Sequence, residues 1–268
     1  MMKKLLLILL FSTSAYAQQG SFALYDYEQV EYQVSHNISE VRPIASITKL
    51  FTAITILRSG AELNDKVKVQ GRSGGHFPNG MMVTRHDLMT AMLVSSDNRA
   101  AETLANTYPG GFDRFITDAN DYIRGRGLIN TRIVEPTGLS ALNVSTAEEL
   151  ISFLGAIANN VEIRKMADDR TAEIIVPKGK KFIHIKLNNT NPSIFKFDNI
   201  LISKTGFTNP AGRCVVMLVE KDHRYYGIVV LGQKNVKARS DLANSMITAE
   251  PMPAKPRVED PIVFESPM

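Results

Sequence analysis

The apolar residues between positions 44 and 57 recur at helical spacing, and they form the clearest local pattern in the chain. The positions that share one face of such a helix are Ile47, Leu50, Phe51, Ile54 and Leu57. Ala53 and Ile56 add apolar side chains on another flank. A helix that is apolar on most sides is usually buried. We therefore expect this helix at the centre of the molecule.

Strand-like and helical patterns divide the rest of the chain into three parts. Residues 21–34 are rich in aromatic and β-branched side chains and predict two strands. The middle part predicts helices at residues 84–93, 98–106, 112–124 and 147–159. The last part predicts strands at residues 174–187, 200–204, 213–220 and 224–231, followed by a closing helix at residues 236–248. Strands at both ends that enclose helices predict an α/β or α+β fold with a helical insertion.

The first 17 residues have the pattern of a secretory signal peptide. Lys3 and Lys4 form a basic start, residues 5–11 are apolar, and residues 15–17 read Ala-Tyr-Ala, a small-x-small cleavage site. The apolar stretch is too short to span a bilayer, which takes about 20 residues. No cysteine directly follows the cleavage site, so we expect no lipid anchor, and because the apolar stretch is too short we expect no integral membrane anchor. An exported protein is the prediction.

The other end of the chain is rich in proline. Five of the twelve prolines lie after residue 250, which predicts an extended or disordered tail at residues 250–268. We expect one folded domain, at residues 18–249, between the signal peptide at 1–17 and this tail.

Charge and cysteine content exclude several kinds of protein. The formal net charge of +4 falls to +2 when Lys3 and Lys4 leave with the signal peptide, so nothing indicates a nucleic-acid partner. Cys214 is the only cysteine, so no internal disulfide can form, and we expect it as a small apolar residue of a strand. The five histidines are scattered, and no stretch has the spacing of metal ligands. We expect no metal and no cofactor.

Two tetrapeptides place a serine three residues before a lysine, SITK at 46–49 and SIFK at 193–196. On a helix such residues lie side by side, so Ser46 and Lys49 would project together from the start of the apolar helix. The helix start also leaves backbone N–H groups free to bind an oxyanion. Burial disfavours a charged lysine, which would let Lys49 act as a base. SIFK follows Asn191-Pro192 in a polar loop, and we interpret it as a chance match.

Two further tripeptides have the composition of active-site motifs. Ser96-Asp97-Asn98 lies in a predicted turn between helices, where short polar side chains can point into a cleft. Lys204-Thr205-Gly206 ends an apolar strand, and its glycine would let a substrate backbone approach closely. Ser35-His36-Asn37 has the same spacing as the first tripeptide but ends a strand, and we set it aside. Each motif alone also fits a plain structural role; the three in order favour an active site.

SxxK, SDN and KTG in this order are shared by class A β-lactamases and penicillin-binding proteins. The stretches that carry the resemblance are RPIASITKL, SSDNRAAETLANTYPGG, VEPTGLSALNVSTAEEL and KTGFTNPAGRCVVM. They resemble the low-molecular-mass D-alanyl-D-alanine peptidases, serine peptidase family S11, and within it the penicillin-binding protein 7 type of endopeptidase. The resemblance implies a β-lactamase/transpeptidase-like fold, with an antiparallel five-stranded sheet flanked by helices. It also implies a periplasmic enzyme that hydrolyses peptidoglycan and is acylated by β-lactam antibiotics.

The resemblance further implies catalytic roles for five residues. Ser46 would attack the carbonyl group of a D-alanine and form an acyl-enzyme, and Lys49 would take its proton. Ser96 and Lys204 would relay a proton to the leaving amine. Asn98 would hold Lys49 and the substrate amide.

Four residues would bind the substrate on the same basis. The backbone N–H of Phe207, with that of Ser46, would form the oxyanion hole. Thr205, next to Gly206, would meet the terminal carboxylate of the substrate together with Lys204. Arg239 is a further candidate, because carboxypeptidases of the family carry a carboxylate-binding arginine in the corresponding place. A solvated arginine at a helix end is the equal alternative.

Three rival functions remain to be compared. A class A β-lactamase needs a glutamate in an ExxLN loop, and the corresponding region, VEPTGLSALN, does not match, because Glu135 is followed by Pro136. A non-catalytic wall-binding module would be expected to lack Ser46, Lys49 or Lys204. A D-alanyl-D-alanine carboxypeptidase is the main alternative to an endopeptidase. An endopeptidase needs an open cleft, and we expect the glycine-rich loop at 71–80 to form its rim beyond KTG.

Overall fold

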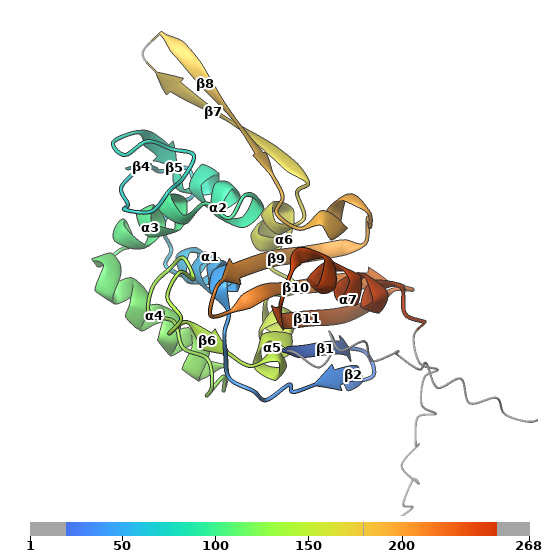
Figure 1. Cartoon of the computed structure of the whole chain (residues 1–268). Coiled ribbons are helices and arrows are strands. Elements are labelled where there is room, and N and C mark those ends of the chain that lie inside the picture. The colour runs from blue at the N-terminus through green and yellow to red at the C-terminus, as the bar shows by residue number, and fades with distance from the viewer. Residues whose placement is uncertain (1–19, 179, 251–268) are drawn as a thin grey trace, which may run out of the picture.

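The computed structural model describes residues 20–178 and 180–250, so the predicted signal peptide and residues 251–268 of the predicted tail lie outside the described residues. Its central feature is an antiparallel five-stranded sheet with the order β2-β1-β11-β10-β9 (Figure 1). The strands are β1 (Ser21–Asp26), β2 (Glu31–His36), β9 (Ile200–Thr208), β10 (Gly212–Lys221) and β11 (Arg224–Gln233). Both ends of the chain contribute to this sheet, which confirms the predicted fold class.

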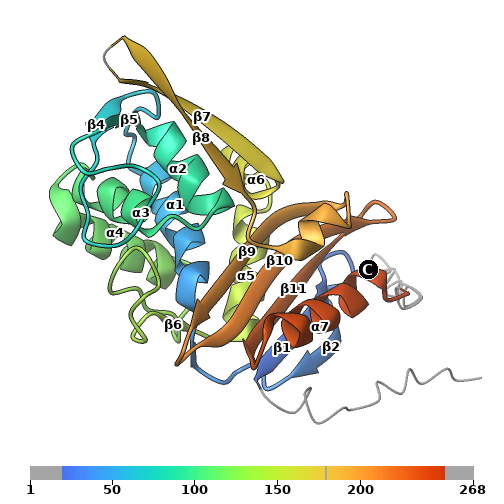
Figure 2. The same cartoon turned by 45° about the horizontal axis from the view of Figure 1, so that its top comes forward.

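Both faces of the sheet are covered, which explains why its central strands are apolar at almost every position. Helix α5 (Ala147–Ile157) lies on one face and α7 (Val236–Thr248) on the other (Figures 1 and 2). Successive side chains of a strand point to opposite faces. Accordingly Val216 of β10 packs in the core that includes α5, and Val215 in the core that includes α7.

A helical lobe is inserted between β2 and β9. Its helices are α1 (Thr48–Arg58), α2 (Arg85–Val94), α3 (Asn98–Asn106), α4 (Gly111–Gly125) and α6 (Val161–Ala167). Every residue of α1 from Thr48 to Ile56 is buried, and Phe51 stacks on Phe153 of α5 with ring centroids 3.8 Å apart. The predicted central helix is therefore confirmed. No helix in the described part of the chain is long and apolar enough to cross a membrane.

The central helix begins later than its apolar pattern predicts. The regular α-helix starts at Thr48, and residues Ala45–Ile47 form a 3₁₀ turn, η1. Ala45 has a φ of +46°, a left-handed conformation that interrupts helical geometry and is strained for a residue with a side chain. Ser46 therefore lies in a tight turn before α1, and Lys49 lies in the first turn of the helix itself.

Three pairs of strands lie outside the main sheet in the described part of the chain. They are β3 (Arg42–Pro43) with β6 (Val144–Ser145), β4 (Lys66–Lys68) with β5 (Met82–Thr84), and β7 (Thr171–Lys178) with β8 (Lys181–Asn188). The predicted strand at 174–187 thus becomes a hairpin that extends from the body of the molecule past α2 (Figures 1 and 2). A 3₁₀ turn, η2 (Pro192–Phe195), leads from the hairpin towards β9.

Candidate active site

Ser46 and Lys49 of SITK lie side by side at the junction of η1 and α1. The distance between Ser46 Oγ and Lys49 Nζ is 3.0 Å. Lys49 is fully buried, whereas Ser46 is partly exposed. The pair therefore places a reachable hydroxyl group over a buried amine, which is the arrangement that the sequence predicted.

Lys49 Nζ has two further partners, and both are hydrogen-bond acceptors in this arrangement. Asn98 Oδ1 lies 2.7 Å away and the backbone carbonyl oxygen of Thr137 lies 2.5 Å away. A neutral amine has two N–H bonds and one lone pair. The two N–H bonds match Asn98 and Thr137, and the lone pair is left to accept the proton of the Ser46 hydroxyl group. The three contacts accommodate either this neutral amine or an ammonium group that donates to all three oxygens, so burial decides the protonation state.

The electrostatics of Lys49 agree with this geometry. Burial lowers its pKa from 10.5 to about 7, against the opposing influence of the negative charges of Glu135, Asp97 and Glu102. At neutral pH a large fraction of Lys49 is therefore neutral. Such an amine is poised to take a proton from a neighbouring hydroxyl group.

The SDN motif forms the turn between α2 and α3. Asp97 is the N-cap of α3, with Oδ1 accepting a hydrogen bond from the Ala100 N–H at 2.8 Å, and Asn98 is the first residue of the helix. Ser96 has a φ of +61°, again a strained left-handed conformation. Ser96 is partly exposed, and it is not among the hydrogen-bond partners of Lys49.

The KTG motif lies near the end of β9, directly against the nucleophile turn. A Cβ atom built on Gly206 would lie 2.9 Å from the Ser46 backbone nitrogen and 3.0 Å from Ala45 Cβ. Only a residue without a side chain allows β9 to come this close. The close approach brings the backbone of Phe207, the next residue, beside that of Ser46. The two N–H groups expected to form an oxyanion hole therefore come from adjacent segments.

Lys204 is almost completely buried on the same strand. Its Nζ donates a hydrogen bond to the Thr205 carbonyl oxygen at 3.2 Å, and no carboxylate of the described residues pairs with it. Burial lowers its pKa well below the usual value, and the positive charges of Lys49 and Arg239 lower it further. Lys204 is thus a buried amine whose charged form lacks a carboxylate partner among the described residues.

Arg239 is buried as well, which rules out the solvated helix-end arginine that was the alternative. It is 4% exposed in the first turn of α7. Its Nε has no hydrogen-bond partner among the described residues, and one of its terminal nitrogens donates to Ser240 Oγ at 3.3 Å. Burial and the nearby charge of Arg213 lower the pKa of this guanidinium. A buried guanidinium whose Nε lacks a partner, and whose charge acts on the Lys204 amine, is suited to an anionic ligand.

The substrate-binding candidates on β9 have ordinary neighbours. Thr205 Oγ1 lies 2.6 Å from the hydroxyl oxygen of Thr190, a residue that follows β8. Phe207 is 45% exposed, and the guanidinium of Arg213 lies 3.6 Å above the centre of its ring. Thr190 was not singled out from the sequence, because nothing in its local pattern connects it with β9.

The loop from Glu135 to Asn143 was also missed as part of the site. Thr137 supplies the carbonyl oxygen that contacts Lys49. Gly138 has a φ of +86°, and a Cβ atom there would lie 1.9 Å from the Ala45 carbonyl oxygen. This glycine therefore lets the loop pack against the nucleophile turn. The dipeptide Thr-Gly after a proline was the available signal, but it is common in ordinary turns.

Glu135 organises this loop instead of facing the nucleophile. One carboxylate oxygen accepts from the N–H and the hydroxyl group of Thr137, at 2.7 and 2.6 Å. The other accepts from the Gly138 N–H at 2.7 Å and the Asn143 side-chain amide at 2.8 Å. A carboxylate that accepts so many hydrogen bonds is poorly suited to activate a water molecule for fast deacylation. This arrangement argues against a β-lactamase.

The decoy motifs lie apart from this site. Ser193 of SIFK is buried in η2 and donates to Asn244 Oδ1 at 2.6 Å, while Lys196 is exposed. The expectation of a plain polar loop was wrong in detail, because Pro192 starts a short 3₁₀ turn.

Cys214 is a buried strand residue, and burial raises its pKa to about 11. Within the described residues no group of three or more acidic, histidine or cysteine side chains could hold a metal ion.

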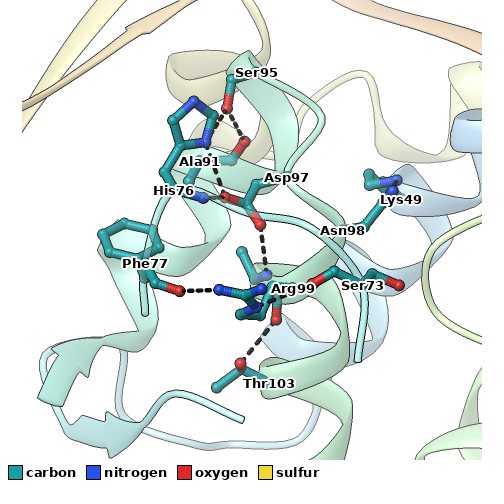
Figure 3. A network of polar contacts seen from close by, with 11 residues as sticks. Lys49, Ser73, His76, Phe77, Ala91, Ser95, Asp97, Asn98, Arg99 and Thr103 are labelled. Atoms are coloured by element: carbon teal, nitrogen blue, oxygen red, sulfur yellow. Dashed lines mark hydrogen bonds and ion pairs between the residues drawn. The ribbon is translucent and has the colours of Figure 1, made fainter. Parts of the chain in front are cut away.

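The loop at 71–80 is fastened to α3, on the SDN side of the site (Figure 3). Asp97 Oδ2 accepts hydrogen bonds from the His76 N–H at 2.5 Å and contacts the His76 ring nitrogen Nδ1 at 2.9 Å. Arg99 donates to the carbonyl oxygens of Ser73 and Phe77, at 3.0 and 2.8 Å. The expectation that this loop lies beyond KTG is therefore wrong. Its backbone groups form hydrogen bonds with Asp97 and Arg99, at the start of α3.

The same carboxylate, Asp97, thus holds the loop and caps the helix that presents Asn98. Glu102, one turn further along α3, accepts from the backbone N–H groups of Arg72 and Ser73 at 2.7 and 3.0 Å. We call the contacts of Asp97, Arg99 and Glu102 with residues 72–77 the α3 clamp. The clamp therefore connects this surface loop with Asn98, a hydrogen-bond partner of Lys49.

The chain is similar to known D,D-peptidases along most of its length. Residues 12–235 match the profile of peptidase family S11, described as D-alanyl-D-alanine carboxypeptidase. A D-alanyl-D-alanine endopeptidase of Escherichia coli is 36% identical over 220 residues, which cover 79% of this chain and 70% of that protein. That of Pseudomonas aeruginosa is 35% identical over 252 residues, 88% and 81% of the two chains. A carboxypeptidase of Haemophilus influenzae is 27% identical over 234 residues, 82% and 58%.

Solved structures confirm the fold class. The crystal structure of a Streptomyces DD-transpeptidase superposes with a TM-score of 0.79 at 22% identity, covering 86% of this chain and 95% of that one. Penicillin-binding protein D2 of Listeria monocytogenes, in its ampicillin-bound form, gives a TM-score of 0.75 at 24% identity, covering 86% and 96%. The five-stranded sheet with an inserted helical lobe is thus a fold shared with these proteins.

Proposed function

The chain belongs to the D-alanyl-D-alanine carboxypeptidase family of serine peptidases, S11, and we propose that it is an exported endopeptidase that cleaves the cross-links of peptidoglycan. Its class, a serine-type D,D-peptidase, follows from the family and from relatives at 35–36% identity. The single observation that supports the catalytic assignment best is the set of three contacts around the Lys49 amine, with Ser46, Asn98 and Thr137.

The acylation step uses these groups in order. Lys49 accepts the proton of the Ser46 hydroxyl group as the oxygen attacks the carbonyl carbon of a D-alanine. The N–H groups of Ser46 and Phe207 stabilise the negative oxygen of the tetrahedral intermediate. The C–N bond then breaks, and the proton that Lys49 took from Ser46 passes to the leaving amine by way of Ser96 and Lys204, which leaves Lys49 neutral again. The product of this step is an ester between Ser46 and the first peptide.

Deacylation reverses these roles with water as the nucleophile. Water loses a proton to Lys49 and attacks the ester carbonyl, and the Ser46 oxygen leaves as it regains a proton. The second product is a peptide with a free carboxylate. Asn98 holds the Lys49 amine in place in both steps, through the contact of 2.7 Å.

Lys204, Thr205 and Arg239 form the binding site for a carboxylate in this scheme. Burial disfavours the charged forms of Lys204 and Arg239, and an anionic substrate group would compensate both. A terminal D-alanine carries its carboxylate one residue after the scissile bond. A cross-linking diamino acid carries one at the same distance, on its D-configured carbon. The cationic pair therefore suits both an endopeptidase and a carboxypeptidase.

The choice of endopeptidase rests on similarity. The relatives at 36% and 35% identity are endopeptidases, while the carboxypeptidase from Haemophilus influenzae is 27% identical. The predicted signal peptide supports a location in the periplasm, where peptidoglycan is the partner and β-lactam antibiotics are covalent inhibitors through Ser46. The carboxypeptidase reaction on pentapeptides is the second candidate, favoured by the same cationic pair.

The decisive experiment compares two defined substrates. The purified protein without residues 1–17 is incubated with a cross-linked muropeptide dimer and with a pentapeptide monomer, and the products are separated by liquid chromatography and identified by mass spectrometry. We expect the dimer to be cut and Ser46→Ala to be inactive on both. Release of D-alanine from the monomer while the dimer remains intact would favour the carboxypeptidase.

A further inference from the structure

The β7–β8 hairpin has two faces of different character. Its inner face carries Ile174, Val176, Ile185 and Leu187, which are buried in the main core with the helical lobe. Eight-residue strands span about 26 Å, and the hairpin carries its outer residues well beyond the sheet (Figures 1 and 2). The inner face is sufficient to explain how the hairpin is held. It does not explain the residues on the outer face.

The outer face carries exposed apolar residues at paired positions. Phe182 is 65% exposed and lies opposite Pro177, and Ile175 is 52% exposed and lies opposite His184. An exposed phenylalanine next to an exposed proline in a hairpin makes no contribution to the core. Large exposed apolar side chains that gather in one place indicate a contact surface.

Basic residues lie at the tip of the hairpin and along β8. Lys180, Lys181 and Lys186 are all exposed, and Glu173 is the one acidic residue of the described hairpin positions. Glu173 is already engaged, because its carboxylate lies 3.1 Å from the His184 ring nitrogen. Of the charged residues, Lys186 shares the outer face with Glu173, Lys180 lies in the turn, and Lys181 pairs with Lys178 on the side of the inner residues. The hairpin therefore has an exposed aromatic ring on its outer face and positive charge at its tip.

The hairpin is directly connected with the substrate-binding strand. Thr190 follows β8 by two residues, and its hydroxyl oxygen lies 2.6 Å from that of Thr205 in KTG. The Thr190 N–H also donates to the carbonyl oxygen of Val94, at the end of α2. The base of the hairpin thus lies at the cleft, and the outer face continues away from it.

We propose that the outer face and the tip of the β7–β8 hairpin bind a strand of peptidoglycan and so hold the polymer while the cleft cuts it; this inference rests on the proposed function. The partner is a polymer of N-acetylated sugars that carry acidic peptides. Sugar rings present C–H groups that pack on an aromatic face such as that of Phe182. The peptide carboxylates complement Lys180, Lys181 and Lys186.

Two features favour this polymer over an anionic lipid surface. The apolar residues are few, and Glu173 lies among them, whereas an interfacial element has a continuous apolar face. The hairpin also begins at the cleft, where a long substrate must enter or leave. A substrate larger than the cleft would cover both surfaces at once, and two linked contacts bind more tightly than one.

The test separates binding of the polymer from chemistry. Both variants are made in an inactive Ser46→Ala background. The hairpin variant carries Lys181→Glu and Phe182→Ser. The η2 variant carries Phe195→Ser and Lys196→Glu, which alter an exposed phenylalanine at the end of η2 and the exposed lysine that follows it. Binding to isolated sacculi is measured by co-sedimentation. We expect the hairpin variant to bind at least fivefold more weakly and the η2 variant to bind as the parent does. Equal binding by both variants would overturn the proposal.

The same hairpin change in the active protein provides a second measurement. We expect this variant to release fragments from sacculi more slowly but to cleave the soluble dimer at an unchanged rate. Its acylation by labelled penicillin should also be unchanged, which would show that the protein is folded. An equal loss on sacculi and on the dimer would place the effect in the cleft and contradict the proposal. Hairpin-dependent binding to phosphatidylglycerol vesicles, with none to sacculi, would assign the surface to lipid instead. If no substrate is cut at all, the proposed function fails, while the binding comparison still decides the role of the hairpin.

Discussion

At the scale of single residues, the protonation state of Lys49 decides whether Ser46 can be activated. The amine is surrounded by two acceptors, Asn98 Oδ1 and the Thr137 carbonyl oxygen, which take both of its N–H bonds. A protonated Lys49 would have no lone pair for the Ser46 proton. Because burial brings its pKa to about 7, the neutral form is available under ordinary conditions.

Replacement of Lys49 by alanine should abolish acylation. General-base catalysis contributes roughly 10²–10⁴-fold, so the second-order rate with labelled penicillin should fall by at least a hundredfold. Lys196→Ala, in the decoy motif, is the matched control and should react normally. Circular dichroism checks that both variants are folded. Normal acylation of folded Lys49→Ala would show that another group is the base.

The pH dependence should follow the same amine. Below about pH 7 the rate of acylation should fall about tenfold for each unit of pH, because Lys49 gains a proton, and above this value it should level off. The shift also affects stability. The unfolded chain binds the Lys49 proton more tightly between about pH 7 and 10.5, so this group makes the free energy of unfolding rise with pH in that range. A rate that does not change between pH 5 and 8 would contradict the assignment.

Replacement of Arg239 by methionine should increase stability and weaken substrate binding. Arg239 is a buried guanidinium without a carboxylate partner among the described residues, so Arg239→Met should raise the free energy of unfolding, by about 1 kcal/mol. The same change should raise the KM for peptides that carry the expected carboxylate. Urea unfolding and steady-state kinetics measure the two effects. A less stable variant with unchanged KM would mean that Arg239 is a structural residue.

At the scale of elements, the site depends on where segments begin. The 3₁₀ turn before α1 carries Ser46, the first residue of α3 is Asn98, and β9 carries KTG. Glycines at 138 and 206 let a loop and a strand approach the same turn from two sides. Ser46, Lys49, Ser96 and Asn98 therefore lie at or next to the ends of regular elements, while Lys204 lies in the middle of β9; each is held by the packing of its segment against its neighbours.

The α3 clamp yields a prediction at this scale. Asp97→Ala removes the helix cap and the contacts with His76, and we expect a loss of about 1 kcal/mol or more of stability together with slower acylation, because Asn98 is no longer held in place. Glu102→Ala is the matched change, since it also frees the loop at 71–80 but does not adjoin Asn98. Thermal unfolding and penicillin acylation are measured for both. Equal loss of acylation in the two variants would place the effect in the loop.

At the scale of the whole molecule, the sequence was sufficient to predict the fold class and the three motifs. Both depend on local patterns, namely apolar periodicity and residue types at fixed spacing. Thr137 and Thr190 could not be predicted this way, because one acts through its backbone carbonyl group and the other through a contact across the fold. The burial of Arg239 was likewise invisible, since it depends on how α7 packs on the sheet.

The larger of the two cores extends across the site, and this determines how the molecule should lose activity. The main cluster of buried residues includes Ala23 and Leu231 of the sheet as well as Leu93 and Leu104 of the helical lobe. Ser46, Asn98 and Lys204 come from distant parts of the chain and meet only when both regions are packed together. Domains with one continuous core usually unfold cooperatively.

Acylation and structure should therefore be lost together in urea. We expect the rate of penicillin acylation and the circular dichroism signal to decline with the same midpoint, because no part of the site can form without the shared core. Mass spectrometry at each urea concentration should show one adduct per folded molecule, on the peptide that contains Ser46, with Ser193→Ala as a control that reacts normally. Loss of acylation at a clearly lower urea concentration would mean that the helical lobe opens before the sheet unfolds. In that case the site would depend on a locally unstable contact between η1 and β9, and a substitution of Gly206 would lower the acylation midpoint further.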